Sequence, residues 1–203
     1  MTVKTRFLVL GATAKTGRRV AEQLQNLGHS VRAVSRSTTP SFDWTKPDTW
    51  DDVLRDIDAV YVTFQPDLAV PGSDQIIADF AARALRHGAK RLVMLSGRGE
   101  DAARDAERTL RNSGADWTVL RANWFFQNFS EDLFLPYLQN GVLALPAGDI
   151  PEPFVDADDI AECAVTAILD PAHIGKTYEL SGPDALTFEE ATAIIASSAN
   201  RDI

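Results

Sequence analysis

A glycine-rich segment at residues 11–17, Gly-Ala-Thr-Ala-Lys-Thr-Gly, follows a short apolar run and precedes a pattern of helical spacing. Backbone N–H groups at the start of a helix attract phosphate, and glycines there let the phosphate approach closely. The order Gly-Lys-Ser/Thr of a triphosphate-binding loop is absent. We therefore expect the pyrophosphate of a dinucleotide to bind here, a plain turn without ligand being the alternative. The residues expected to contact it are Gly11, Thr13, Ala14, Lys15, Thr16 and Gly17.

The segment after the second apolar run indicates which dinucleotide is preferred. Sites that prefer NAD usually place Asp or Glu there, to bind the ribose hydroxyls. This chain has Ser35, Arg36 and Ser37 instead. A guanidinium with flanking hydroxyls suits the 2′-phosphate of NADP. We therefore predict NADP(H) in preference to NAD(H), the alternative being that Arg36 is only a solvated turn residue.

No familiar catalytic group is apparent in the sequence. A tyrosine followed four residues later by lysine could exchange a proton with a substrate, but Gln65, Gly141 and Gly182 stand in the lysine position after the three tyrosines. Cys163 lies on the apolar side of a predicted helix, which favours core packing over a nucleophilic role. The three histidines fall in predicted turns, loops or helix ends, and no cluster has the spacing of metal ligands. We predict neither a metal nor a flavin, and the catalytic residues stay unassigned.

The elements that must position these residues alternate along the chain. Short apolar runs predict strands at residues 7–10, 31–34, 58–63, 91–96, 117–121 and 177–180, and helical patterns separate them. This alternation predicts an α/β fold with a doubly wound parallel sheet, the Rossmann fold. The sequence also predicts short strands at residues 142–145 and 154–155, a helix N-cap at Asp156, and a capping box of Thr187 and Glu190.

Residues at the carboxyl ends of the strands should border the dinucleotide, because a Rossmann fold binds its ligands at that edge. Besides the loop and residues 35–37, the expected cofactor contacts are Thr63, Phe64, Gln65, Ser96 and Gly97. The expected substrate pocket comprises Arg98, Asn123, Trp124 and Phe125. The aromatic rings of Trp124, Phe125 and Phe126 could stack on a flat acceptor, and packing in the core is the alternative for them.

Composition limits the kind of protein and its partners. The 203 residues carry a formal net charge of −9, which argues against nucleic acid or an anionic membrane as the main partner. A single cysteine and the lack of a signal-peptide pattern favour a cytoplasmic protein. We expect residues 1–203 to form a single NAD(P)-binding domain. Within it, residues 123–155 and 177–203 contribute a small substrate-side subdomain, whose completeness is left open.

Five segments resemble the NmrA-like branch of the atypical short-chain dehydrogenase/reductase superfamily: residues 7–36, 58–63, 92–97, 114–128 and 154–192. In this branch the first loop usually reads Gly-Ala-Thr-Gly-x-Thr-Gly, so this chain departs from it at Ala14. A methyl group there is expected to weaken or shift cofactor binding. Residues 120–129 are most similar to the members that act on ergot alkaloids. Relatives also continue well beyond the helix expected to end near Ser198, which would leave the substrate pocket partly open.

The resemblance implies an NADPH-dependent oxidoreductase that transfers hydride to an electrophilic small molecule, such as a quinone, an azo compound or an imine. Such acceptors need orientation in a dry pocket more than strong acid catalysis, which agrees with the missing tyrosine–lysine pair. Other members bind the dinucleotide without turnover, so a redox-sensing regulator that contacts a protein partner is the alternative. A third alternative is a structural scaffold that has lost cofactor binding, and this hypothesis rests on Ala14 alone. Whether the protein is a monomer or a homodimer is left open.

Overall fold

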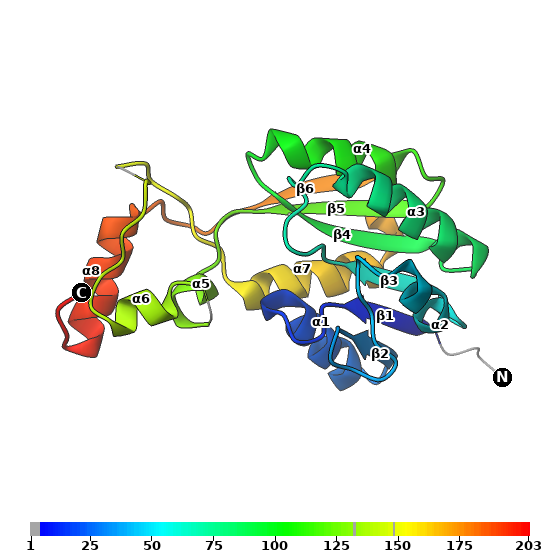
Figure 1. The fold of residues 1–203 in the computed structure, drawn as a ribbon, viewed down its shortest axis with the longest axis horizontal. Helices are drawn as coiled ribbons and strands as arrows, with labels where there is room; N and C mark the ends of the chain where they lie inside the picture. Colours follow the sequence, from blue (N-terminus) through cyan, green and yellow to red (C-terminus); the bar gives the residue numbers. More distant parts are fainter. Residues whose placement is uncertain (1–4, 132, 148) are drawn as a thin grey trace.

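A computed structural model of the chain describes residues 5–131, 133–147 and 149–203 (Figure 1). Its centre is a six-stranded sheet in the order β2-β1-β3-β4-β5-β6, in which every neighbouring pair of strands is parallel. The strands are β1 (Arg6–Leu10), β2 (Ser30–Val34), β3 (Ala59–Val62), β4 (Arg91–Gly97), β5 (Asp116–Ala122) and β6 (Lys176–Leu180). The predicted doubly wound α/β fold is confirmed, and each of these strands forms within one residue of its predicted bounds.

Helices cover both faces of this sheet (Figure 1). Those on one face are α1 (Lys15–Asn26) and α7 (Ala157–Leu169); those on the other are α2 (Trp50–Leu54), α3 (Ser73–Arg86) and α4 (Arg104–Arg111). Short 3₁₀ turns lie at Pro47–Thr49, Asp101–Ala103 and Pro171–His173. Alternate strand residues point to opposite faces, so Leu8 and Leu10 join one core cluster while Phe7 and Val9 join the other. Because both faces exclude water, the inner strands β1 and β3 read as nearly unbroken apolar runs, whereas the edge strands β2 and β6 are only partly buried and include charged residues.

A smaller group of helices lies beside the sheet and follows β5 and β6 along the chain (Figure 1). It comprises α5 (Gln127–Ser130), α6 (Leu135–Gln139) and α8 (Phe188–Ala199). Its core is a phenylalanine cluster in which neighbouring ring centroids lie 5.1–6.1 Å apart, formed by Phe129, Phe134, Phe154 and Phe188. This group therefore has a hydrophobic core of its own, distinct from the two that flank the sheet.

Two strand predictions in this smaller group are wrong. Residues 142–145, all within the described chain, form no strand. Of residues 154–155, only Val155 pairs, through an isolated bridge to Phe125. Leu143 and Leu145 pack against the phenylalanine cluster instead, while Val142 is exposed, so this short apolar run is buried on one side without strand pairing.

The two predicted helix starts are confirmed. The carboxylate of Asp156 accepts a hydrogen bond from the Asp158 N–H (2.7 Å), and α7 begins directly after it. Thr187 and Glu190 form both bonds of the capping box, at 3.0 and 2.8 Å, and α8 follows. Each cap satisfies backbone N–H groups that the first helical turn leaves without a partner inside the helix.

Helix α1 approaches β1 closely at Gly17. A Cβ atom there would lie 2.2 Å from the carbonyl oxygen of Gly11 and 2.8 Å from that of Leu10. Gly11 itself has a φ of +69°, and a Cβ on it would lie 2.7 Å from the side chain of Thr63. The tight turn and the close contact bring the start of α1 to the carboxyl end of β1. There β2 and β3 lie on opposite sides of β1, which is the switch point where such sheets bind ligands.

Replacing Gly17 by Ala is expected to destabilise the fold by about 3 kcal/mol, because the methyl group must displace backbone atoms. The matched change Gly28→Ala meets no atom within 4 Å and should cost only its left-handed backbone conformation, about 1–2 kcal/mol. Urea denaturation followed by circular dichroism measures both free energies of unfolding. Equal losses in the two variants would contradict the packing argument.

Candidate functional site

A crevice of about 900 Å³ opens at the carboxyl ends of β1, β2 and β3. Residues predicted for the cofactor make up much of its wall: Gly11, Thr13, Ala14, Lys15, Ser35, Arg36, Ser37, Thr63 and Gln65. Thr16 and Gly17 are instead buried where α1 packs on the sheet. The remaining predicted cofactor residues, Phe64, Ser96 and Gly97, border a neighbouring cavity.

Backbone hydrogen bonds, one within the glycine-rich loop and one to β2, hold that loop in place. The Ala12 N–H donates to the Val34 carbonyl (2.9 Å), and the Ala14 N–H donates to the Gly11 carbonyl (2.8 Å). Ala14 is the N-cap of α1, with φ −82° and ψ 163°, a conformation that any residue adopts. Position 14 therefore needs no glycine for its backbone, and Ala14 forms part of the crevice wall. The first turn of α1 begins directly after it, where backbone N–H groups and the helix dipole favour an anion.

The turn after β2 presents Arg36 to the same crevice. The Thr38 hydroxyl accepts a hydrogen bond from the Ser35 N–H (2.8 Å), and the Ser35 hydroxyl accepts one from the Ser37 N–H (3.2 Å). These bonds hold the turn, while Arg36 is exposed at the crevice wall. A guanidinium with hydroxyls beside it matches the chemistry of a phosphate monoester.

Four consecutive residues of the crevice wall, residues 42–45, are not identified by sequence reasoning. The Trp44 indole N–H donates to the Thr63 carbonyl (3.1 Å), and Phe42 packs edge-on against Trp44, with ring centroids 4.9 Å apart. Hydrogen bonds from the backbone and hydroxyl of Thr45 hold the pKa of the Asp43 carboxyl below its ordinary value. The sequence marks this segment only by two aromatic residues, Phe42 and Trp44, in an otherwise polar stretch. That pattern predicts burial, but it does not predict that the segment lines the crevice.

A second cavity, of about 380 Å³, adjoins the crevice and shares Thr63 and Pro66 with it. Its wall contains all the residues predicted for the substrate: Arg98, Asn123, Trp124 and Phe125. Trp124 is 43% exposed, yet it also stacks on Phe134 with ring centroids 5.7 Å apart. The two interpretations of Trp124 are therefore compatible, because the indole both packs on the phenylalanine cluster and borders the cavity.

A buried carboxylate lies behind the second cavity. Glu107, on α4, accepts hydrogen bonds from the Ser96 hydroxyl (2.8 Å) and from the Arg121 guanidinium (2.7 and 2.9 Å), and Arg111 adds a third donor (2.8 Å). Burial alone would raise the pKa of the Glu107 carboxyl, but the bonds from Arg121 and Ser96 and the nearby positive charges hold it below its ordinary value. Ser96 thus directs its proton at Glu107.

A chain of polar contacts continues from this carboxylate to the cavity wall. Arg121 and Arg98 both bond Glu179, at 3.3 and 3.1 Å. Arg98 also donates to the side-chain oxygen of Asn123 (3.0 Å), and the Asn123 amide donates to Glu152 (3.0 Å). The ends of β4, β5 and β6 are therefore tied together through charged side chains, and the amide of Asn123 is held in one orientation.

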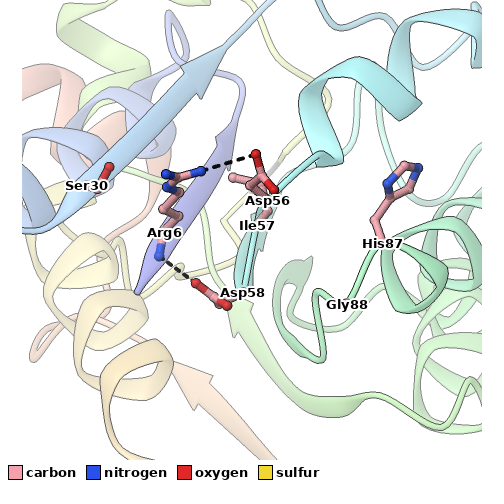
Figure 2. A pocket seen from close by; sticks show the side chains of 7 residues that line it. All are labelled: Arg6, Ser30, Asp56, Ile57, Asp58, His87 and Gly88. Carbon is pink, nitrogen blue, oxygen red and sulfur yellow. Dashed lines mark hydrogen bonds and ion pairs between the residues drawn. The ribbon is translucent and has the colours of Figure 1, made fainter. Parts of the chain in front are cut away.

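A hollow of about 520 Å³ lies at the opposite edge of the sheet, near the amino ends of β1 and β3 (Figure 2). The Arg6 guanidinium pairs with Asp56 (3.3 Å), and the Arg6 backbone N–H donates to Asp58 (2.8 Å). His87, on the far side of the hollow in Figure 2, pairs with Asp51 (3.0 Å). The Arg6 guanidinium thus has its counter-charge in the wall of the hollow, and no residue predicted for the site lines it. The candidate site is therefore the pair of adjoining cavities at the carboxyl edge.

Other reactive side chains take part in packing. Cys163 packs against the core cluster between the sheet and α1, and burial together with Glu162 raises the pKa of its thiol. His29 packs edge-on against Phe7. Within the part of the chain that the structure describes, no group of three or more His, Cys, Asp or Glu could hold a metal ion, and no helix is long and apolar enough to cross a membrane. That no metal or flavin takes part stays a prediction.

Comparison with known proteins identifies the family. A family profile described as NAD(P)H-binding matches residues 11–171. The chain is 32% identical to the uncharacterized oxidoreductase YesF of Bacillus subtilis, over 97% of this chain and 72% of that protein. It is 29% identical to the NAD(P)H azoreductase of Xenophilus azovorans, over 97% of this chain and 75% of that one.

A solved structure of similar fold is the triphenylmethane reductase of Citrobacter sp. in complex with NADP(H). It superposes with a TM-score of 0.79 at 16% identity, covering 98% of this chain and 77% of that one, and at this identity the likeness shows the fold alone. The chain belongs to the NAD(P)H-binding, NmrA-like family of atypical short-chain dehydrogenases/reductases, a family of NAD(P)H-dependent oxidoreductases. The predicted resemblance is confirmed.

Replacing Glu107 by Gln is expected to destabilise the protein by about 3 kcal/mol at neutral pH, because two guanidinium groups lose a buried carboxylate. The pKa of Glu107 is lower in the folded chain, so its stabilisation is complete above the ordinary value near 4.5 and is lost as pH falls through the lower folded value. Urea denaturation at pH values from about 7 down to about 3 measures this loss. The exposed Glu22→Gln is the control. A destabilisation that does not shrink in acid would contradict the charged state of Glu107.

Proposed function

We propose that this protein is an NADPH-dependent reductase that passes hydride to an electrophilic small molecule. The observation that carries the proposal is the pair of adjoining cavities at the carboxyl edge of the sheet, joined at Thr63 and Pro66. The first, of about 900 Å³, has the wall chemistry that a dinucleotide needs. The second, of about 380 Å³, has the size and mixed polarity of a site for a small organic ligand.

Three features of the chain suit the first cavity to NADP(H). The start of α1 supplies backbone N–H groups and the positive end of the helix dipole for a pyrophosphate. The contact of Gly17 on β1 brings that helix start to the crevice. Arg36, beside the hydroxyls of residues 35 and 37, supplies the cation for a 2′-phosphate. We therefore assign NADP(H) in preference to NAD(H).

The second cavity holds the acceptor. Bound NADPH supplies a hydride from its nicotinamide ring, and the task of the chain is to orient an acceptor beside that ring and exclude water. Trp124 and Phe125 give the cavity a flat apolar wall, and Asn123 presents an amide fixed between Arg98 and Glu152. An acceptor of this kind would lie against the aromatic wall and bond the fixed amide.

The engagement of Ser96 narrows the class of acceptor. Because the Ser96 hydroxyl donates to Glu107, its proton is not offered to a ligand. Acceptors that take hydride without a strong acid fit this arrangement best, namely quinones, azo compounds and imines. The azo class agrees with the activity for which the relative from Xenophilus azovorans is named.

A redox-sensing regulator that binds NADP(H) without turnover is the second candidate. The engaged hydroxyl of Ser96 and the missing tyrosine–lysine pair favour it, because both remove a proton donor from the site. The two candidates share the first cavity and differ only in the use of the second.

The change Arg36→Ala is expected to weaken NADPH binding by about 10- to 100-fold and to leave NADH binding within about twofold, because only NADPH carries the 2′-phosphate. Titration of nicotinamide fluorescence measures both dissociation constants. Arg55→Ala, which removes an exposed arginine away from the crevice, is the control. An equal loss for both cofactors, or tighter NADH binding by the wild type, would contradict the assignment.

Turnover is tested by following NADPH absorbance with a panel of quinones, azo dyes and cyclic imines. At least one class should be reduced, and Trp124→Ala should raise the KM for a flat acceptor by about tenfold, because it removes the aromatic wall. Phe126→Ala is the matched control, since Phe126 is 41% exposed and lies outside that wall. No turnover with any acceptor, together with binding of both oxidised and reduced cofactor, would favour the regulator.

A further inference from the structure

An ion pair that the proposed function does not use lies in the wall of the first cavity. Arg18, on α1, and Glu131, which directly follows α5, both line the crevice beside the glycine-rich loop. The Arg18 guanidinium bonds the Glu131 carboxylate at 2.7 Å. A carboxylate therefore lies in the part of the crevice that is otherwise suited to a pyrophosphate.

The neighbouring Arg19 holds Glu131 from the other side. It bonds the same carboxylate at 2.9 and 3.3 Å, and it is anchored by the Lys15 carbonyl (2.9 Å) and by Asp158 (2.9 Å). The side chain of Arg19 is 13% exposed, whereas that of Arg18 is 45% exposed. Arg19 is thus a fixed partner of Glu131, and Arg18 is the partner that can turn toward a ligand.

The charge of Glu131 is permanent at working pH. The hydrogen bond from Arg19, helped by Arg18, lowers the pKa of the Glu131 carboxyl to about 2. An anionic carboxylate in the crevice repels an anionic ligand, while an arginine attracts it. The two side chains therefore have opposite effects on a cofactor that carries several phosphate charges.

We propose that Arg18 is a further ligand of the cofactor's pyrophosphate and that Glu131 competes with the pyrophosphate for it. A guanidinium bonds phosphate oxygens with the same geometry that it uses for a carboxylate, so Arg18 can exchange one anion for the other. The exchange leaves Glu131 paired, because Arg19 remains on it. Glu131 thereby sets cofactor affinity below the value that the arginine alone would give. This inference rests on the proposed binding of NADP(H), and not on turnover.

The test is calorimetric titration of NADP⁺ into the wild-type chain, Glu131→Gln, Arg18→Gln and the double variant. Glu131→Gln should tighten binding by about three- to fivefold, because the competing charge is gone. Arg18→Gln should weaken binding by about tenfold, because a charge-assisted bond to phosphate is lost. In the double variant the gain from Glu131→Gln should fall below about twofold, since there is no longer an arginine to compete for and only the screened repulsion between Glu131 and the phosphates is relieved.

Glu22→Gln is the matched control, because it removes one exposed carboxylate from the same helix outside the crevice and should leave affinity unchanged. Thermal denaturation of every variant shows whether it folds. If Glu131→Gln fails to fold, Arg18→Gln still tests whether Arg18 binds the cofactor.

Three results would overturn the competition. These are unchanged or weaker binding by Glu131→Gln, unchanged binding by Arg18→Gln, and a gain that keeps its full size in the double variant. If no variant binds NADP⁺ at all, the cofactor assignment fails together with this inference. If NADP⁺ binds but its affinity changes with neither Arg18 nor Glu131, only this inference is wrong and the cofactor assignment stands.

Discussion

The candidate site depends on the close approach of α1 to the end of β1 at Gly17, where a Cβ atom would lie 2.2 Å from the carbonyl oxygen of Gly11. This approach allows α1 to lie directly on the end of β1, at the switch point between β2 and β3. The shape of the crevice depends on that approach, and so does the orientation of the first helical turn. Arg18, the residue after Gly17, is brought to the crevice in the same way. A side chain at residue 17 would have to displace these backbone atoms, so the packing of α1 on β1 also sets the shape of the crevice.

A buried charge, Glu107, organises the carboxyl ends of β4, β5 and β6, beside the second cavity. Glu107 is fully buried and has guanidinium partners on β5 and α4, and through Arg121 and Glu179 it ties the ends of β4, β5 and β6 together. Such a group is costly to bury, and it is tolerated here because each carboxylate oxygen is hydrogen-bonded. The second cavity is therefore built on strand ends that resist relative movement, which suits a site that works mainly by orientation.

The smaller group of helices connects the two cavities. Its phenylalanine cluster supports Trp124, which borders the second cavity, while Glu131 extends from the same group into the first. One hydrophobic core thus places a wall residue of the candidate acceptor site and a charged residue of the candidate cofactor site. Release of Arg18 from Glu131 would change a contact of the same group of helices on which Trp124 packs.

The sequence by itself determined the elements whose signals are local. Six strands were predictable to within one residue because each carries a short run of mainly apolar residues, which is nearly unbroken where both faces are buried. Two helix starts were predictable because a cap needs only residues two or three apart. The glycine-rich loop was predictable for the same reason. The prediction at residues 142–145 was wrong because a short apolar run indicates burial whether or not a strand pairs.

Only the tertiary structure decided which residues share a cavity. Phe64 follows β3 in the chain yet borders the second cavity, and residues 42–45 join the first because the Trp44 indole bonds the Thr63 carbonyl. Glu131 meets Arg18 at the crevice although the two residues are more than a hundred positions apart in the sequence. Such contacts depend on how separate elements pack against each other, and a local pattern of residue types carries no information about that packing.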